Sequence, residues 1–130
     1  MLAKKLFELP VPGSGCGETQ IVTDGVECVI RYEFHKDGKD WIGAIKFIGL
    51  VAHRFRNEYH SAGYAGEAYD SVAEILDSTW LKELVKLEPA GVRGASGKHH
   101  FAVFLSSNGY FEIIADAFET LPAKEGLLST

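Results

Sequence analysis

The fold class of this 130-residue chain is decided by one stretch, His100-Phe-Ala-Val-Phe-Leu-Ser-Ser-Asn-Gly-Tyr-Phe-Glu-Ile-Ile-Ala-Asp-Ala-Phe118. Two apolar runs flank Asn108-Gly109, and an Asn-Gly pair in that setting is the strongest short-range signal for a β-hairpin, because both residues accept positive φ. We therefore expect a strand over residues 100–107, a turn at Asn108-Gly109, and a returning strand over residues 110–118.

A second hairpin is expected nearer the N-terminus. Residues 26–34 alternate between an apolar and a more polar face, which is the period-two pattern of a half-buried strand. Asp37-Gly38 supplies a tight turn. Residues 41–56 then follow as one long strand, apolar on both faces as far as Ala52, which predicts a central strand covered on both sides.

One helix is predicted after these strands. Asp77 or Ser78 is a suitable N-cap, and the apolar residues that follow have helical spacing as far as Val85. Residues 67–77 fit a helix and a strand about equally, so both alternatives stay open there.

The remaining segments are expected to be irregular. Residues 2–9 are a short apolar lead-in, and residues 13–17 form a glycine-rich connector. Residues 88–98 are expected to form a mobile loop, and the last dozen residues to fray. The chain is thus predicted to be a single domain, residues 1–130, of the α+β class, with a predominantly antiparallel sheet of about five to six strands and one or two short helices packed on it.

Composition narrows the function. The net charge is −5, from 13 basic and 18 acidic residues, so nucleic acid is not expected as a partner, since binding a phosphate backbone needs concentrated Lys and Arg. No apolar run is long enough to span a membrane. Glu8 and Pro10 interrupt the first apolar stretch, so a cytoplasmic location is predicted. Cys16 and Cys28 are expected to be reduced thiols, and a bridge between them would require Cα atoms about 6 Å apart.

Histidines are the first group of candidate functional residues. Imidazoles from neighbouring strands, with Glu112 or Asp116 as a carboxylate, could hold a metal ion. The spacings match no known ligand motif, so neither a metal nor a cofactor is predicted. Ser14 and Cys16 lie in a glycine-rich loop without the G-x-S-x-G pattern, and no nucleophile is assigned to either.

A basic and aromatic cluster around residues 53–80 is the second group. Tyr, Trp and Arg are the preferred anchors of protein interfaces, and this region contains Tyr69 and Trp80 besides its histidines and arginines. The binding candidates from both groups are His53, Arg54, Arg56, Tyr59, His60, Tyr64, His99 and His100.

Three stretches carry a resemblance: IKFIGLVAHR (residues 45–54), AYDSVAEILDSTWLKEL (residues 68–84) and HHFAVFLSSNGYFEIIAD (residues 99–116). Together they resemble a group of small bacterial proteins with no established activity. The resemblance implies no catalytic residues. It favours a strand over residues 70–76 leading into the Ser78 helix, and it implies a partner-binding role, toxin neutralisation included.

Two functions follow as hypotheses. The first is a binding domain without catalysis, whose partner is another protein or a second copy joined through a sheet edge. It predicts exposed aromatic side chains near residues 53–80. The alternative is a protein that binds a small molecule or metal, or an enzyme, using His53, His60, His99 and His100 in a cleft at one end of the sheet. This alternative requires at least two of the rings to converge.

Overall fold

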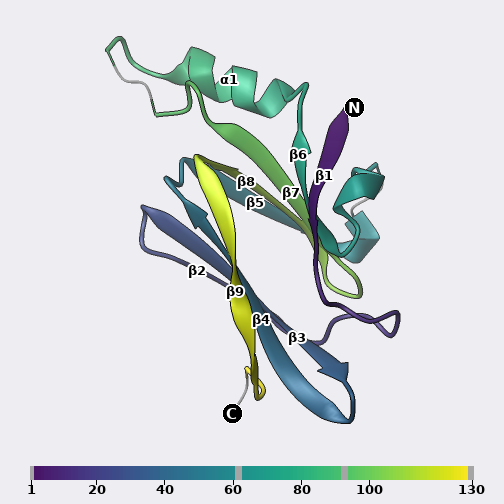
Figure 1. Ribbon diagram of the computed structural model, residues 1–130. Helices are drawn as coiled ribbons and strands as arrows, with labels where there is room; N and C mark the ends of the chain where they lie inside the picture. Colours follow the sequence, from purple (N-terminus) through teal and green to yellow (C-terminus); the bar gives the residue numbers. More distant parts are fainter. Residues whose placement is uncertain (1, 61–62, 92–93, 129–130) are drawn as a thin grey trace.

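Two antiparallel sheets packed face to face form the body of the molecule (Figure 1). This computed structural model describes residues 2–60, 63–91 and 94–128. Sheet A has the strand order β1-β6-β7-β8-β5, and sheet B has the order β2-β3-β4-β9. The predicted class, mostly antiparallel β with a short helix, is confirmed. The strands in the described ranges are more numerous than expected and are divided between two sheets.

The elements have the following bounds. Sheet A contains β1 (Ala3–Glu8), β5 (Ala52–Asn57), β6 (Ser71–Ile75), β7 (His99–Leu105) and β8 (Gly109–Ala115). Sheet B contains β2 (Thr19–Thr23), β3 (Glu27–Lys36), β4 (Lys39–Ile48) and β9 (Ala117–Glu125). The helix is α1 (Thr79–Leu87), and two 3-10 turns are η1 (Glu58–His60) and η2 (Gly66–Ala68).

Both predicted hairpins are present. The β3–β4 turn has positive φ at Asp37 and Gly38, 55° and 75°, as a tight hairpin turn requires. The β7–β8 turn differs from expectation, because Leu105 pairs with Gly109 and the loop is residues 106–108, with positive φ at Ser107. The Asp70 carboxylate accepts hydrogen bonds from the Ser106 amide and hydroxyl, at 2.8 and 2.9 Å, which fixes the start of this longer loop.

The prediction of one long strand over residues 41–56 was wrong. The chain leaves sheet B after β4, turns at Gly49, and enters sheet A as β5. The run after the second turn divides in the same way, since β8 ends at Ala115 and β9 belongs to sheet B. The two crossings lie side by side, with the Asp116 amide donating to the Ile48 carbonyl at 2.8 Å. Alternating hydrophobicity continues through such a crossing, so the pattern alone does not reveal it.

Two further expectations were wrong for sheet B. β4 is central in its sheet as predicted, between β3 and β9, but it is covered on one face only: Phe47 is fully buried, whereas Ile48 on the other face is 38% exposed. The C-terminal segment was expected to fray, but it forms a strand as far as Glu125. This strand, β9, pairs with β4 along its length and sets Phe118 opposite Phe47. The N-terminal lead-in is also a strand, β1, paired with β6.

The open alternatives around the helix are decided by the structure. Residues 71–75 form β6, as the resemblance favoured, and α1 follows with Ser78 as its N-cap, whose Oγ accepts the Leu81 amide at 2.9 Å. The predicted loop 88–98 is irregular where it is described, and its residues 92–93 lie outside the described part. Cys16 and Cys28 are both free thiols. No helix in the described part of the chain is long and apolar enough to cross a membrane.

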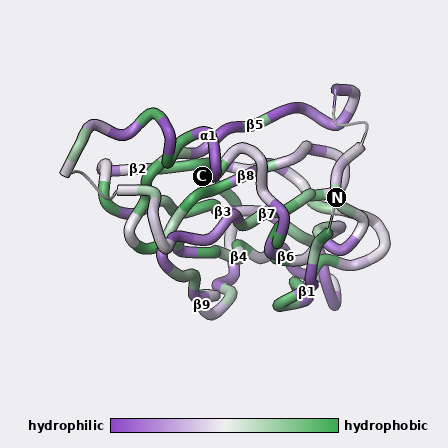
Figure 2. Tube along the Cα trace, turned by 90° about the horizontal axis from the view of Figure 1, so that it is seen from above, coloured by the Kyte–Doolittle hydropathy of each residue, from purple (hydrophilic) through white to green (hydrophobic). Residues whose placement is uncertain are grey.

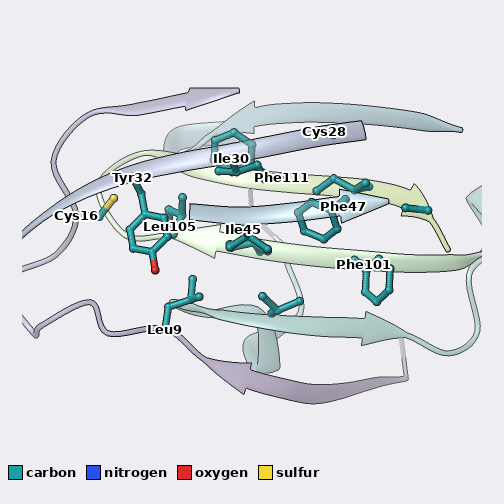
Figure 3. Close-up of a cluster of buried hydrophobic side chains, with 14 of the residues drawn as sticks. Leu9, Cys16, Cys28, Ile30, Tyr32, Ile45, Phe47, Phe101, Leu105 and Phe111 are labelled. Atoms are coloured by element: carbon teal, nitrogen blue, oxygen red, sulfur yellow. The ribbon is translucent and has the colours of Figure 1, made fainter. Parts of the chain in front are cut away.

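The main core lies between the sheets. Figure 3 shows side chains of both sheets meeting there, with Ile45 and Phe47 from β4 opposite Phe101 and Phe111 from β7 and β8. A smaller apolar cluster lies on the opposite face of sheet A, beneath η2. That second face is called the outer face of sheet A below.

Replacing Gly49 with alanine should destabilise the crossing between the sheets. Gly49 has φ +74°, and a Cβ there would collide with the Asp116 carboxylate. A left-handed conformation costs a non-glycine residue about 1–2 kcal/mol, and the collision adds to this. Gly38→Ala is the matched control, because Gly38 has φ +75° and open space around its Cβ position. Urea unfolding should show a larger loss for Gly49→Ala, and equal losses would contradict the role assigned to the collision.

Candidate functional site

The outer face of sheet A brings together polar side chains from four separate segments. Arg54 on β5 and Ala102 on β7 both pair with Glu112 on β8, and side chains directly opposite in a ladder point to the same face. Residues two positions away, such as His100 and Arg56, therefore share this face as well. Helix α1 lies near one end of the face, and η2 covers the other (Figure 1).

A buried polar network occupies the end of this face near α1. It consists of Ser78, His100, Glu112 and Arg54. Ser78 Oγ lies 2.6 Å from His100 Nδ1, and His100 Nε2 lies 2.9 Å from Glu112 Oε1. Arg54 donates to both carboxylate oxygens of Glu112, at 2.7 and 3.1 Å. Ser78, His100 and Glu112 are each buried.

Glu112 is ionised in this setting. Burial by itself raises the pKa of Glu112, but the hydrogen bonds from His100 and Arg54 and the charge of Arg54 outweigh it and lower the pKa to about 2. An ionised carboxylate only accepts hydrogen bonds, so His100 Nε2 carries the proton in this bond. In neutral His100, Nδ1 is then the acceptor for the Ser78 hydroxyl.

A pocket of about 270 Å³ opens beside the network. Its walls include Ile75, Thr79 and Trp80 together with the network residues. The Trp80 ring meets the His100 ring edge-on with centroids 5.3 Å apart, and the Arg54 guanidinium lies 4.0 Å above the Trp80 ring. Trp80 is therefore the residue that joins α1 to both the imidazole and the guanidinium.

The other end of the outer face is aromatic. Tyr64 stacks on Phe104 with ring centroids 4.1 Å apart, and Tyr69 stacks on the same ring at 5.7 Å. Tyr110 is buried beside them, and Arg56 lies 5.6 Å above its ring. Arg56 thus connects the aromatic end to the polar network.

Strand β5 forms one edge of sheet A next to both groups. It pairs with β8 on one side, and within the described ranges no strand pairs with its other side. His53 to Asn57 are all exposed, and Phe55 is 48% exposed while its ring contacts Phe111 with centroids 4.7 Å apart. Figure 2 shows this strand largely in the colours of hydrophilic residues.

The structure does not bring the four predicted histidines together. His99 and His100 are neighbours on β7 and point to opposite faces, and His99 pairs with Glu74 at 2.7 Å. His60 Nδ1 lies 2.6 Å from Asn57 Oδ1 in η1. His53, an odd-numbered residue of β5, faces away from His100. Among the residues described, no group of three His, Cys, Asp or Glu side chains could hold a metal ion, so the four histidines do not form a metal site there.

Part of the predicted site is gathered on or beside the outer face. Arg54, Arg56, Tyr64 and His100 lie on it, and Tyr59 in η1 is 86% exposed. Glu112 was expected beside the histidines only as a carboxylate ligand of a metal ion. Ser78 was not expected to act together with His100, because their separation along the chain hides the contact. Once the length of the β7–β8 loop is known, the alternation of side chains along the two paired strands places His100 and Glu112 on the same face of the sheet.

The glycine-rich loop contributes no reactive thiol. Burial raises the pKa of Cys16 to about 12, and the nearby carboxylates of Asp70 and Glu33 add to this effect. A thiol with so high a pKa carries almost no thiolate at neutral pH and is a poor nucleophile. Cys16 therefore has the properties of a core residue.

Comparison with known proteins gives no relative: no family model, no curated protein and no solved structure matches this chain. The resemblance of residues 45–54, 68–84 and 99–116 to small bacterial proteins stays a prediction. The roles of the residues on the outer face therefore rest on their own geometry.

Proposed function

We propose that this protein is a protein-binding domain that adds an extended, acidic segment of its partner to strand β5. The observation that carries this is the edge position of β5, with which no strand in residues 2–60, 63–91 and 94–128 pairs on the side away from β8. An open edge of this kind is a template for one more strand, and peptides bind many domains in this way. No step of this function requires catalysis.

β5 is better suited to this role than the other three edges. β1 carries Lys4, Lys5 and an irregularity in its pairing, and β9 carries Pro122 and Lys124, which are devices that block edge-to-edge pairing. β2 has the short sequence TQIVT, without an arginine or an aromatic residue. β5 keeps an uninterrupted register with β8 and contains the residue types that dominate interface energies.

The side chains around β5 favour an acidic partner. The strand reads Ala-His-Arg-Phe-Arg-Asn, with two arginines and no acidic residue. Opposite charges on directly paired strands stabilise a sheet, so Asp or Glu in the added strand would find Arg56 on the outer face, next to Arg54, which is bonded to Glu112. Phe55 and Tyr59, 48% and 86% exposed, offer apolar area to the same segment.

The same charges disfavour a second copy of this chain. A two-fold axis that pairs β5 antiparallel with itself keeps each face of the sheet continuous. The two longest registers then set Arg54 opposite itself or opposite Arg56. Like charges directly opposite one another destabilise strand pairing, so the partner is expected to be a different protein.

Selection from a random dodecapeptide display library tests this proposal. The wild type should enrich peptides that alternate apolar residues with Asp or Glu, and Arg56→Glu should bind them at least about tenfold more weakly because it reverses the charge at the edge. Arg31→Glu on β3 of the other sheet is the matched control and should bind normally. Selected peptides should also protect the β5 amides from hydrogen exchange. Enrichment of no peptide, or of peptides insensitive to Arg56→Glu, would contradict the proposal.

A further inference from the structure

The polar network beside α1 has an arrangement that binding through β5 does not use. A hydroxyl, an imidazole and an ionised carboxylate are joined in sequence, with 2.6 Å between Ser78 Oγ and His100 Nδ1 and 2.9 Å between His100 Nε2 and Glu112 Oε1. A nucleophile within hydrogen-bond reach of a base, which is oriented by a third group, is the recognisable signature of nucleophilic catalysis.

Proton positions in the network suit that chemistry. Glu112 is held by two hydrogen bonds from Arg54, so it keeps its charge and fixes the proton of the imidazole on Nε2. Nδ1 is then free to accept the hydroxyl proton of Ser78. The roles of the two ring nitrogens are reversed relative to the serine protease triad, where Nε2 faces the serine, but each ring nitrogen can serve as the base.

The place of Ser78 in the fold adds a second element. Ser78 is the N-cap of α1, and the first amides of a helix have no acceptor within the helix. The amides of Thr79 and Trp80 therefore lie at the end of the helix where Ser78 sits. Backbone amides at a helix N-terminus stabilise the negative charge that develops on a carbonyl oxygen under attack.

The pocket sets the size and polarity of the substrate. Ser78 lines it together with the apolar walls of Ile75 and Trp80. Its volume of about 270 Å³ is below the ~300–1,000 Å³ of sites for drug-sized ligands. The pocket wall carries one cation, Arg54, beside the anions Glu112 and Asp77, and Arg54 and Glu112 are bonded to each other. No free cation is thus left in this lining for an anionic substrate, so a short, uncharged acyl group is the best fit.

We propose that Ser78, His100 and Glu112 form a catalytic site that hydrolyses small, uncharged carboxylic esters. Ser78 Oγ attacks the carbonyl carbon while its proton passes to His100 Nδ1. The ester C–O bond breaks, and the alcohol leaves with the proton from His100. Water then attacks the acyl group on Ser78, its proton passing through His100 back to Ser78 Oγ, and the carboxylic acid is released. Glu112 remains ionised and acts as a positioning residue.

Two measurements test the site directly. The wild type should hydrolyse p-nitrophenyl acetate with saturation and should be labelled once by diisopropyl fluorophosphate, with the label located on Ser78 by mass spectrometry. Ser78→Gly should abolish both, and His100→Phe should slow both at least about a hundredfold, since general-base assistance contributes about 10²–10⁴-fold. Glycine is a suitable replacement because it preserves much of the N-cap.

The controls separate chemistry from folding. Ser106→Ala replaces another buried serine, bonded to Asp70 rather than to a histidine, and should keep wild-type rates. Circular dichroism melts establish that each variant is folded. A folded wild type that is not labelled on Ser78 by excess reagent, or labelling that is unchanged in His100→Phe, would overturn the proposal. Neither result bears on binding through β5, for which the peptide selection is the independent test.

Discussion

Replacing Phe47 with alanine is expected to lower the free energy of unfolding by about 3–5 kcal/mol, the range for deleting a buried aromatic ring. Phe47 is fully buried between the sheets, with its ring centroid 5.6 Å from that of Phe101 and 6.3 Å from that of Phe118. Domains of this size are stable by only about 5–15 kcal/mol, so the variant should lose a large share of its stability in chemical denaturation.

Phe55→Ala is the comparison for this prediction. Phe55 also packs on a core phenylalanine, Phe111, but it is 48% exposed at the edge of sheet A. Its removal should cost less than half as much as that of Phe47, because less area returns to water and no enclosed cavity forms. Equal costs would contradict the argument that burial between the sheets sets the size of the effect.

Replacing Glu112 with glutamine should have the second-largest effect and should depend on pH. The pKa of Glu112 is lowered from 4.5 to about 2 in the folded protein, and the ionised form therefore contributes about 3 kcal/mol to stability. This contribution is fully present above pH 4.5 and is lost as the pH falls from 4.5 towards 2. The wild type should thus exceed Glu112→Gln by about 3 kcal/mol at pH 7 and by little at pH 2.

Urea unfolding of both proteins across this range provides the measurement. Glu119→Gln is the control, because Glu119 on β9 is half exposed and lies 3.8 Å from Lys46, and surface ion pairs contribute less than about 1 kcal/mol. A difference between the wild type and Glu112→Gln that is the same at pH 2.5 and pH 7 would show that the charge of Glu112 is not what stabilises the network.

The candidate site was only partly accessible from the sequence. The signals for Arg54, Arg56 and Tyr64 were local, since each belongs to a residue type that is typical of interfaces. The sequence suggests His100 and Glu112 as ligands of one metal site, and the two do meet, but as a hydrogen-bonded pair with Arg54 and Ser78. The predicted hairpin already places His100 and Glu112 on neighbouring strands. The segments that carry Arg54 and Ser78 are far from them in the chain, and nothing in the composition of those segments indicates that they converge on the pair.

Local signals determined most of the central elements of this protein, whereas β1 and β9 were not expected from them. The hairpin turns, the strands on either side of them and the helix capped by Ser78 each follow from a few neighbouring residues, because φ preferences, side-chain periodicity and capping act over short distances. Only the tertiary structure decided which sheet each strand joins. A chain segment that crosses from one sheet to the other at Gly49 or Asp116 keeps the same alternating pattern. The reason is that both sheets place apolar side chains in the core between them and more polar side chains on their outer faces. The outer face of sheet A, with its polar network and its exposed edge, is a consequence of those crossings.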